Sequence, residues 1–195
     1  GEALTSIAEM ADWLRAALDA AGVAEAAAVG HSMGALVTLS FAARHSARAI
    51  ALLGAAAAMP VHEGLMTAAR DELPAAIAMM TGWSFSTGAS LGGSATPGLW
   101  LVGGAAALIA RSKPGILAAD LAACNAYAEG EADAAHVRCP ALVIAGERDR
   151  MSPAPAGRAL AEALRGRTAV LRGAGHMLMA ERPDEVLDVL TGWSG

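Results

Sequence analysis

The first part of the chain joins a helical pattern to a short apolar run. Apolar residues at helical spacing predict an amphipathic helix over residues 3–21. Gly22 follows, where a left-handed C-terminal cap belongs. An apolar run at 26–29 then predicts a buried strand that stops at Gly30, and a second helical pattern continues to about His45.

The same alternation of strands and helices returns towards the C-terminal end. Apolar runs at 49–53, 141–145 and 168–171 predict three more buried strands, each closed by a glycine. Helices are predicted at 153–165 and 183–192. Four short apolar strands separated by helical segments predict a parallel sheet with right-handed crossovers, flanked by helices, and therefore the α/β class.

Residues 56–136 differ in character and predict an inserted helical cap. Helical stretches near 63–73, 75–81 and 114–129 surround a segment from 82 to 104 that is rich in Gly, Ser and Thr.

The composition is typical of one domain that has a well-buried core and an insertion. The chain has 195 residues, of which 55% are hydrophobic. A net charge of -5 and the lack of a Lys/Arg cluster argue against nucleic acid and an anionic membrane surface as partners. Apolar runs are broken by Gly or Pro before about 18 residues, so no membrane span is expected. Small uncharged substrates are compatible with this charge and composition.

The two cysteines, Cys124 and Cys139, form no CxxC and no Cys/His pair at zinc spacing. We therefore expect neither a disulfide framework nor a metal, and a reducing cytoplasm as the compartment. Both are interpreted as small buried hydrophobic residues. The heavy use of alanine suggests a G+C-rich bacterial gene.

A G-x-S-x-G motif lies between the first predicted strand and the second helix, at Gly30-His31-Ser32-Met33-Gly34. A nucleophile elbow requires this context of strand, tight turn and helix. The turn strains the serine backbone, and glycines at both flanks are expected to relieve crowding. The alternative is a Gly-rich turn whose serine has no catalytic role.

A base and an orienting acid follow in the order that an elbow serine needs. The serine hydroxyl is activated by a histidine that a carboxylate orients. Asp149 and His176 follow the third and fourth predicted strands, whose C-terminal ends meet beside Ser32. Glu147 is the nearest rival for the acid and is interpreted as a solvated charge. The triad is therefore predicted as Ser32, Asp149 and His176.

The other four histidines are interpreted as structural, because one base suffices for this mechanism. They are His31 beside the elbow, His45 at a helix end, and His62 and His136 at the two hinges of the cap.

These motifs resemble the α/β-hydrolase superfamily, in its branch of capped serine esterases. The motifs are Gly-His-Ser-Met-Gly at 30–34, Cys-Pro to Gly-Glu-Arg-Asp at 139–149, and Gly-His to Glu-Arg-Pro at 175–183. The resemblance implies a partial α/β-hydrolase core at 1–55 and 137–195, with a helical cap at 56–136. It covers nearly the whole chain, although the cap matches only in position.

The sequence departs from the family at its start. Family members place several strands and an oxyanion loop before the nucleophile, whereas this chain opens at Gly1 directly into a helical pattern. An oxyanion hole of this kind uses two backbone N–H donors, and the sequence offers a candidate for only one of them, the Met33 N–H. The strand at 26–29 would form an unpaired edge. We expect the N-terminal strands to be missing, or present as a separate chain of the same protein.

The resulting expectation is a cofactor-free hydrolase that cleaves the ester of a small, apolar substrate through an acyl-enzyme. A thioesterase, lactonase, carbon–carbon bond hydrolase or perhydrolase would use the same triad. The alternative from another class is a non-catalytic fragment or complementing half that acts as an assembly partner. Aromatic and Met residues of the cap are interpreted mainly as core, with some facing the acyl site. They are Met59, Met66, Met79, Met80, Trp83, Phe85 and Trp100.

Overall fold

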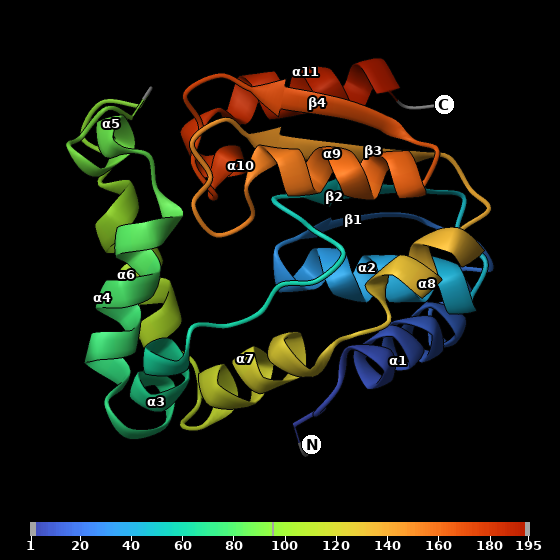
Figure 1. Ribbon diagram of the computed structural model, residues 1–195, viewed down its shortest axis with the longest axis horizontal. Coiled ribbons are helices and arrows are strands. Elements are labelled where there is room, and N and C mark those ends of the chain that lie inside the picture. Colours follow the sequence, from blue (N-terminus) through green and yellow to red (C-terminus); the bar gives the residue numbers. More distant parts are fainter. Residues whose placement is uncertain (1–2, 95, 194–195) are drawn as a thin grey trace.

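The strands of the computed structural model, which describes residues 3–94 and 96–193, form one parallel sheet (Figure 1). Its order is β1-β2-β3-β4, and the strands are β1 (Ala27–His31), β2 (Ala49–Leu53), β3 (Ala141–Gly146) and β4 (Arg167–Leu171). Helices connect successive strands, as parallel pairing demands. The α/β class is confirmed. Gly1 lies outside the described residues.

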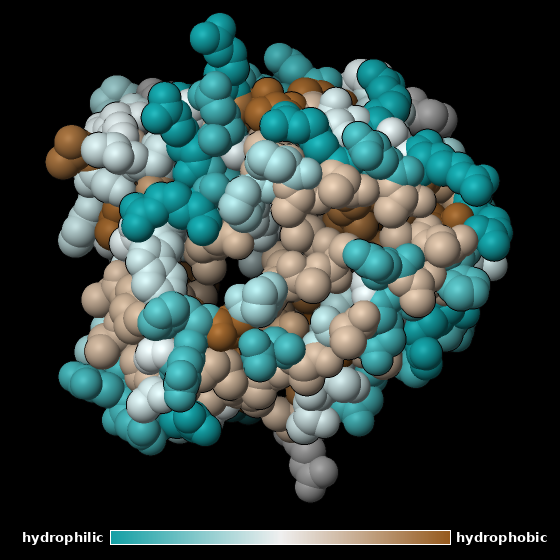
Figure 2. Space-filling view, viewed as in Figure 1, coloured by the Kyte–Doolittle hydropathy of each residue, from teal (hydrophilic) through white to brown (hydrophobic). Residues whose placement is uncertain are grey.

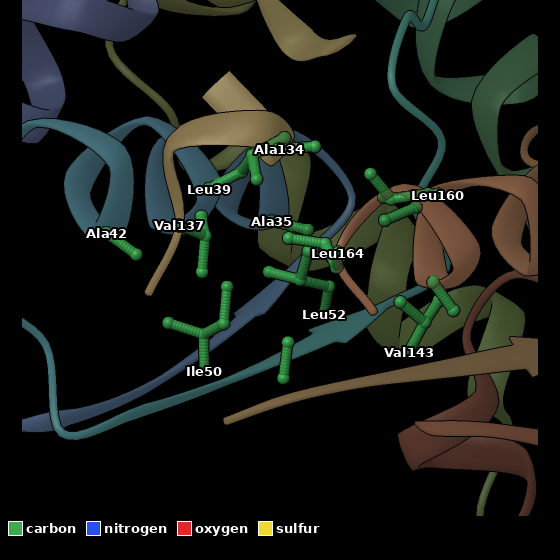
Figure 3. Packing of buried hydrophobic residues seen from close by; sticks show 13 residues of the cluster. Ala35, Leu39, Ala42, Ile50, Leu52, Ala134, Val137, Val143, Leu160 and Leu164 are labelled. Carbon is green, nitrogen blue, oxygen red and sulfur yellow. The ribbon is translucent and has the colours of Figure 1, made fainter. Parts of the chain in front are cut away.

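Helices cover both faces of the sheet. One face carries α2 (Met33–Arg44), α8 (Gly130–His136) and α9 (Ala154–Ala163), with α1 (Ile7–Ala20) packed against α2. Figure 3 shows Leu39 of α2, Ile50 and Leu52 of β2, Val143 of β3 and Leu160 of α9 converging in this layer. The other face is covered by α10 (Leu178–Glu181) and α11 (Pro183–Trp193).

A side-chain cap determines where the first helix begins, and pairing with β2 determines where the first strand ends. The predicted helix over 3–21 begins only at Ile7, because the Ser6 side chain accepts a hydrogen bond from the Glu9 N–H (3.2 Å). Strand β1 continues through Gly30 to His31, two residues beyond the prediction, since Gly30 and His31 lie opposite Leu52 and Leu53 of β2.

The segment 56–136 is helical, as predicted, but its helices are more numerous than predicted. They are α3 (Glu63–Asp71), α4 (Leu73–Ser84), α5 (Thr87–Ser90), α6 (Leu101–Ala110), α7 (Ile116–Ala126) and α8. Helix α6 was missed because it is apolar all round and so lacks an amphipathic period. Helix α8 packs against α2 rather than against the helices α3–α6, which stand apart from the sheet in Figure 1.

Strand β1 is an edge of the sheet, as the sequence predicted. It pairs with β2 on one side only, within the described residues. Val29, at its centre, is 58% exposed. None of the helices in the described ranges is long and apolar enough to cross a membrane.

Candidate active site

The turn between β1 and α2 has the strand, tight turn and helix that a nucleophile elbow requires. Ser32 has φ 54° and ψ -123°, a conformation that non-glycine residues rarely adopt. Its N–H donates to the Leu53 carbonyl (3.0 Å), so the sheet holds the strained residue in place. The strand and the helix approach each other so closely here that a Cβ on Gly30 would overlap the Gly34 carbonyl oxygen and Thr38 Oγ1.

The expectation that glycines at both flanks relieve crowding is therefore correct for only one of them. A Cβ on Gly34 would meet no atom within 4 Å. Gly34 lies in the first turn of α2, where side chains point away from the helix axis, whereas Gly30 faces the helix across the turn.

Asp149 and His176 meet beyond the C-terminal ends of β3 and β4. The His176 Nδ1–H donates to Asp149 Oδ2 (2.8 Å), and the two residues are only 3% and 6% exposed. The other carboxylate oxygen, Oδ1, accepts the N–H groups of Met151 and Ser152, each at 2.8 Å. These bonds fix the carboxylate, which in turn fixes the imidazole ring.

The opposite nitrogen of the His176 ring, Nε2, is buried and makes no hydrogen bond to any of the described residues. His176 and Ser32 line one cavity of about 330 Å³. Figure 2 shows the molecular surface hollowed between helices α3–α6 and the rest of the molecule. The three predicted triad residues thus come from the ends of three strands to one place.

The Met33 N–H, the predicted oxyanion donor, lies at the first residue of α2. It makes no hydrogen bond within the described part of the chain. A free N–H at a helix N-terminus is suited to a developing negative charge.

Comparison with protein families gives one match, the Alpha/beta hydrolase family, over residues 2–189. The chain belongs to this family. The fold and the elbow described above are consistent with that assignment, and together they support a hydrolase. A comparison with curated proteins finds no match.

Solved structures of similar fold include enzymes that act on esters and lactones. The enol-lactonase from Burkholderia xenovorans LB400 is 24% identical, with a TM-score of 0.88 over 96% of this chain and 72% of that one. A malate-bound esterase from Thermogutta terrifontis is 20% identical, with a TM-score of 0.83 over 97% and 72% of the two chains. An esterase from Exiguobacterium antarcticum is 15% identical, with a TM-score of 0.83 over 97% and 74%. At these identities the likeness shows the fold alone.

Within this α/β hydrolase, His31 contacts the site in a way that sequence reasoning missed. Its Nε2–H donates to the His176 carbonyl oxygen (3.0 Å), and the two rings lie 4.7 Å apart. Burial and the nearby His176 lower the pKa of His31 to about 4, so the imidazole is neutral. Its position next to Ser32 was the only sequence signal.

Glu147, the rival acid, forms no hydrogen bond or ion pair with His176 within the described part of the chain. Its Oε2 accepts the Gly173 N–H (2.9 Å), and Arg148 Nε lies 3.8 Å from it. The remaining histidines have local partners: His45 Nε2 lies 2.8 Å from Asp12, His62 Nδ1 accepts the Gly64 N–H (3.1 Å), and His136 donates to the Ala132 carbonyl (2.6 Å).

The cavity is mainly apolar, and only part of the predicted set lines it. Its apolar wall includes Met59, Val61, Leu65, Trp83, Leu121 and Met151. Met79 and Met80 pack against the cluster of Leu65, Ala69 and Ala76, Phe85 packs with Leu101, and Trp100 is exposed.

Cys124 also lines this cavity, and burial raises the pKa of its thiol to about 11. It is therefore a neutral wall residue. No cluster of three or more His, Cys, Asp or Glu that could hold a metal ion occurs among the described residues.

Proposed function

We propose that this chain hydrolyses carboxylic esters of small, apolar substrates through an acyl-enzyme on Ser32. The observation that carries the proposal is the buried Asp149–His176 pair, since His176 lines the same cavity as the strained Ser32 and its Nε2 has no hydrogen-bond partner among the described residues. A free basic nitrogen beside an elbow serine is the arrangement that activates a hydroxyl for attack.

In the first half of the reaction, Ser32 Oγ attacks the ester carbonyl while His176 Nε2 takes its proton. Asp149 accepts the Nδ1–H bond throughout, which selects the tautomer with a free Nε2 and stabilises the imidazolium. The Met33 N–H donates to the oxyanion of the tetrahedral intermediate. His176 then gives its proton to the leaving alcohol. In the second half, His176 takes a proton from water, which attacks the acyl-enzyme, and then gives that proton to Ser32 Oγ as the bond between Ser32 and the acyl group breaks and the acid is released.

The cavity wall supports the apolar part of the proposal. A volume of about 330 Å³ lies at the lower end of the range for small-molecule sites. Met59 and Met151 are adaptable apolar residues, and Trp83 adds a flat apolar surface. An acyl group of a few carbon atoms fits such a wall.

A lactonase is the second candidate within the same chemistry. A lactone is a cyclic ester, and the enol-lactonase is among the structures of similar fold. A thioesterase, a carbon–carbon bond hydrolase or a perhydrolase would use the same triad. Comparing kcat/KM for matched aryl ester, thioester and lactone substrates separates these candidates.

Replacing the nucleophile tests the proposal directly. Ser32→Ala removes the atom that forms the covalent bond, and we expect it to lower aryl ester turnover by about 10⁴-fold or more. A fluorophosphonate probe should label the wild type and not this variant. Ser46→Ala, at an exposed loop serine, is the matched control.

Turnover retained by Ser32→Ala would contradict the assignment of the nucleophile. A folded wild-type protein that the probe does not label would instead favour the alternative of a non-catalytic assembly partner.

A further inference from the structure

Glu181 is a buried acid that the proposed reaction does not use. It is 2% exposed, and no salt bridge joins it to a Lys, Arg or His side chain in the described part of the chain. A carboxyl group without a cation is costly to bury unless hydrogen-bond donors surround it. The identity of those donors therefore indicates what the residue does.

The donors belong to two separate parts of the molecule. The Gly175 N–H donates to Oε1 (3.0 Å), and Gly175 immediately precedes His176. The Ser86 N–H donates to Oε2 (3.2 Å), and Ser86 is the N-cap of α5 in the segment 56–136. One carboxyl group thus links the backbone of the histidine loop to the backbone of the cap.

A second link lies on the other side of the histidine. The Met177 N–H donates to the Ser84 carbonyl oxygen (3.0 Å). The two backbones also touch at Gly175, where a Cβ would lie 2.6 Å from Ser86 N and 2.7 Å from Glu181 Oε1. His176 therefore lies between Gly175, which Glu181 links to Ser86, and Met177, which is bonded to Ser84 directly.

We propose that Glu181 is a positioning residue, which holds the backbone at His176 against cap residues 84–86 and so couples the cap to the catalytic base. The proposal rests on the proposed function. Asp149 orients the imidazole ring, whereas Glu181 fixes the main chain from which that ring extends. Because a displacement of about 1 Å can cost 10²-fold in rate, both restraints are needed for proton transfer.

Glu181→Gln is the first test. The amide keeps the size of the side chain but has one acceptor oxygen, so its NH₂ group faces a backbone N–H. We expect kcat for an aryl ester to fall about tenfold with KM within about twofold, since the substrate wall is untouched. Burst titration with a phosphonate should count the same number of active sites, each reacting more slowly.

Glu147→Gln is the matched control for this substitution. Glu147 also accepts a backbone N–H of the same loop, that of Gly173, but it is exposed and has no bond to the cap. We expect this variant to keep kcat within about twofold.

Gly175→Ala breaks the same contact from the opposite side and keeps Glu181 intact. Its Cβ would push the loop away from Ser86 and Phe85, and we expect a comparable loss of kcat. Gly82→Ala is the control, because a Cβ there meets no atom within 4 Å. This pair decides the question if Glu181→Gln does not fold.

Amide hydrogen exchange tests the link without any turnover. Glu181→Gln should accelerate exchange at Ser86 and Gly175, whereas Glu147→Gln should affect Gly173. If these amides exchange faster but kcat per active site is unchanged in both Glu181→Gln and Gly175→Ala, Glu181 is only structural and the proposal is overturned. A wild type with the expected exchange pattern but without phosphonate labelling would contradict the proposed function instead.

Discussion

At the scale of single residues, the burial of His31 makes the stability of the fold depend on pH. His31 lies against His176, and burial lowers its pKa from 6.5 to about 4. In the unfolded chain its pKa returns to the ordinary value. Between pH 6.5 and about 4 the unfolded state therefore binds more protons, and the stability of the folded state falls as the pH decreases.

We expect His31 to contribute about 3 kcal/mol to the loss of unfolding free energy between pH 7.5 and 4.5. His31→Gln retains an N–H donor for the His176 carbonyl but has no titratable group, so its loss should be smaller by that amount. Urea unfolding of both proteins at the two pH values measures the difference. Equal losses would show that His31 is not protonated on unfolding in this range.

At the scale of elements, the crossing of β1 into α2 determines the position of Ser32. We expect Gly30→Ala to destabilise the protein by about 3 kcal/mol or more, since its Cβ would overlap Gly34 O and Thr38 Oγ1. Gly34→Ala, four residues away on the same elbow, should be neutral or stabilising by about 0.5 kcal/mol. Thermal unfolding of the two variants tests this ranking, and a Gly34→Ala variant that is the less stable would contradict it.

At the scale of the whole molecule, the unpaired edge of β1 is the feature that most favours aggregation. Its backbone groups are paired on one side only within the described residues, and Val29 is 58% exposed. We expect residues 1–195 to self-associate through this edge at high concentration, as measured by light scattering. Adding a peptide strand that pairs with β1 should reduce the association.

Val29→Lys tests this role of the edge strand. A charge there should reduce the association without changing turnover, because Val29 is not among the residues that line the cavity of Ser32 and His176. A monodisperse monomer of the unmodified chain at high concentration would contradict this prediction.

Local patterns in the sequence predicted the four strands and the order of the three proposed catalytic residues along the chain. Apolar runs closed by glycines placed β1 to β4 within two residues, because strands buried on both faces are continuously apolar. The G-x-S-x-G motif and the strand ends singled out Ser32, Asp149 and His176, and their roles remain predictions. Helix α6 was not predicted, because a helix that is apolar on all sides shows no alternation of apolar and polar residues along the sequence.

Only the tertiary structure decided which groups surround the histidine. The bond from His31 to the His176 carbonyl joins residues 145 positions apart, and Glu181 reaches Ser86 across 95 positions. Such contacts depend on how the sheet, the cap and the loops pack in space, so no periodicity along the chain reports them. The same is true of Gly30 and Gly34, which look alike in the motif and differ only in what lies opposite each Cα.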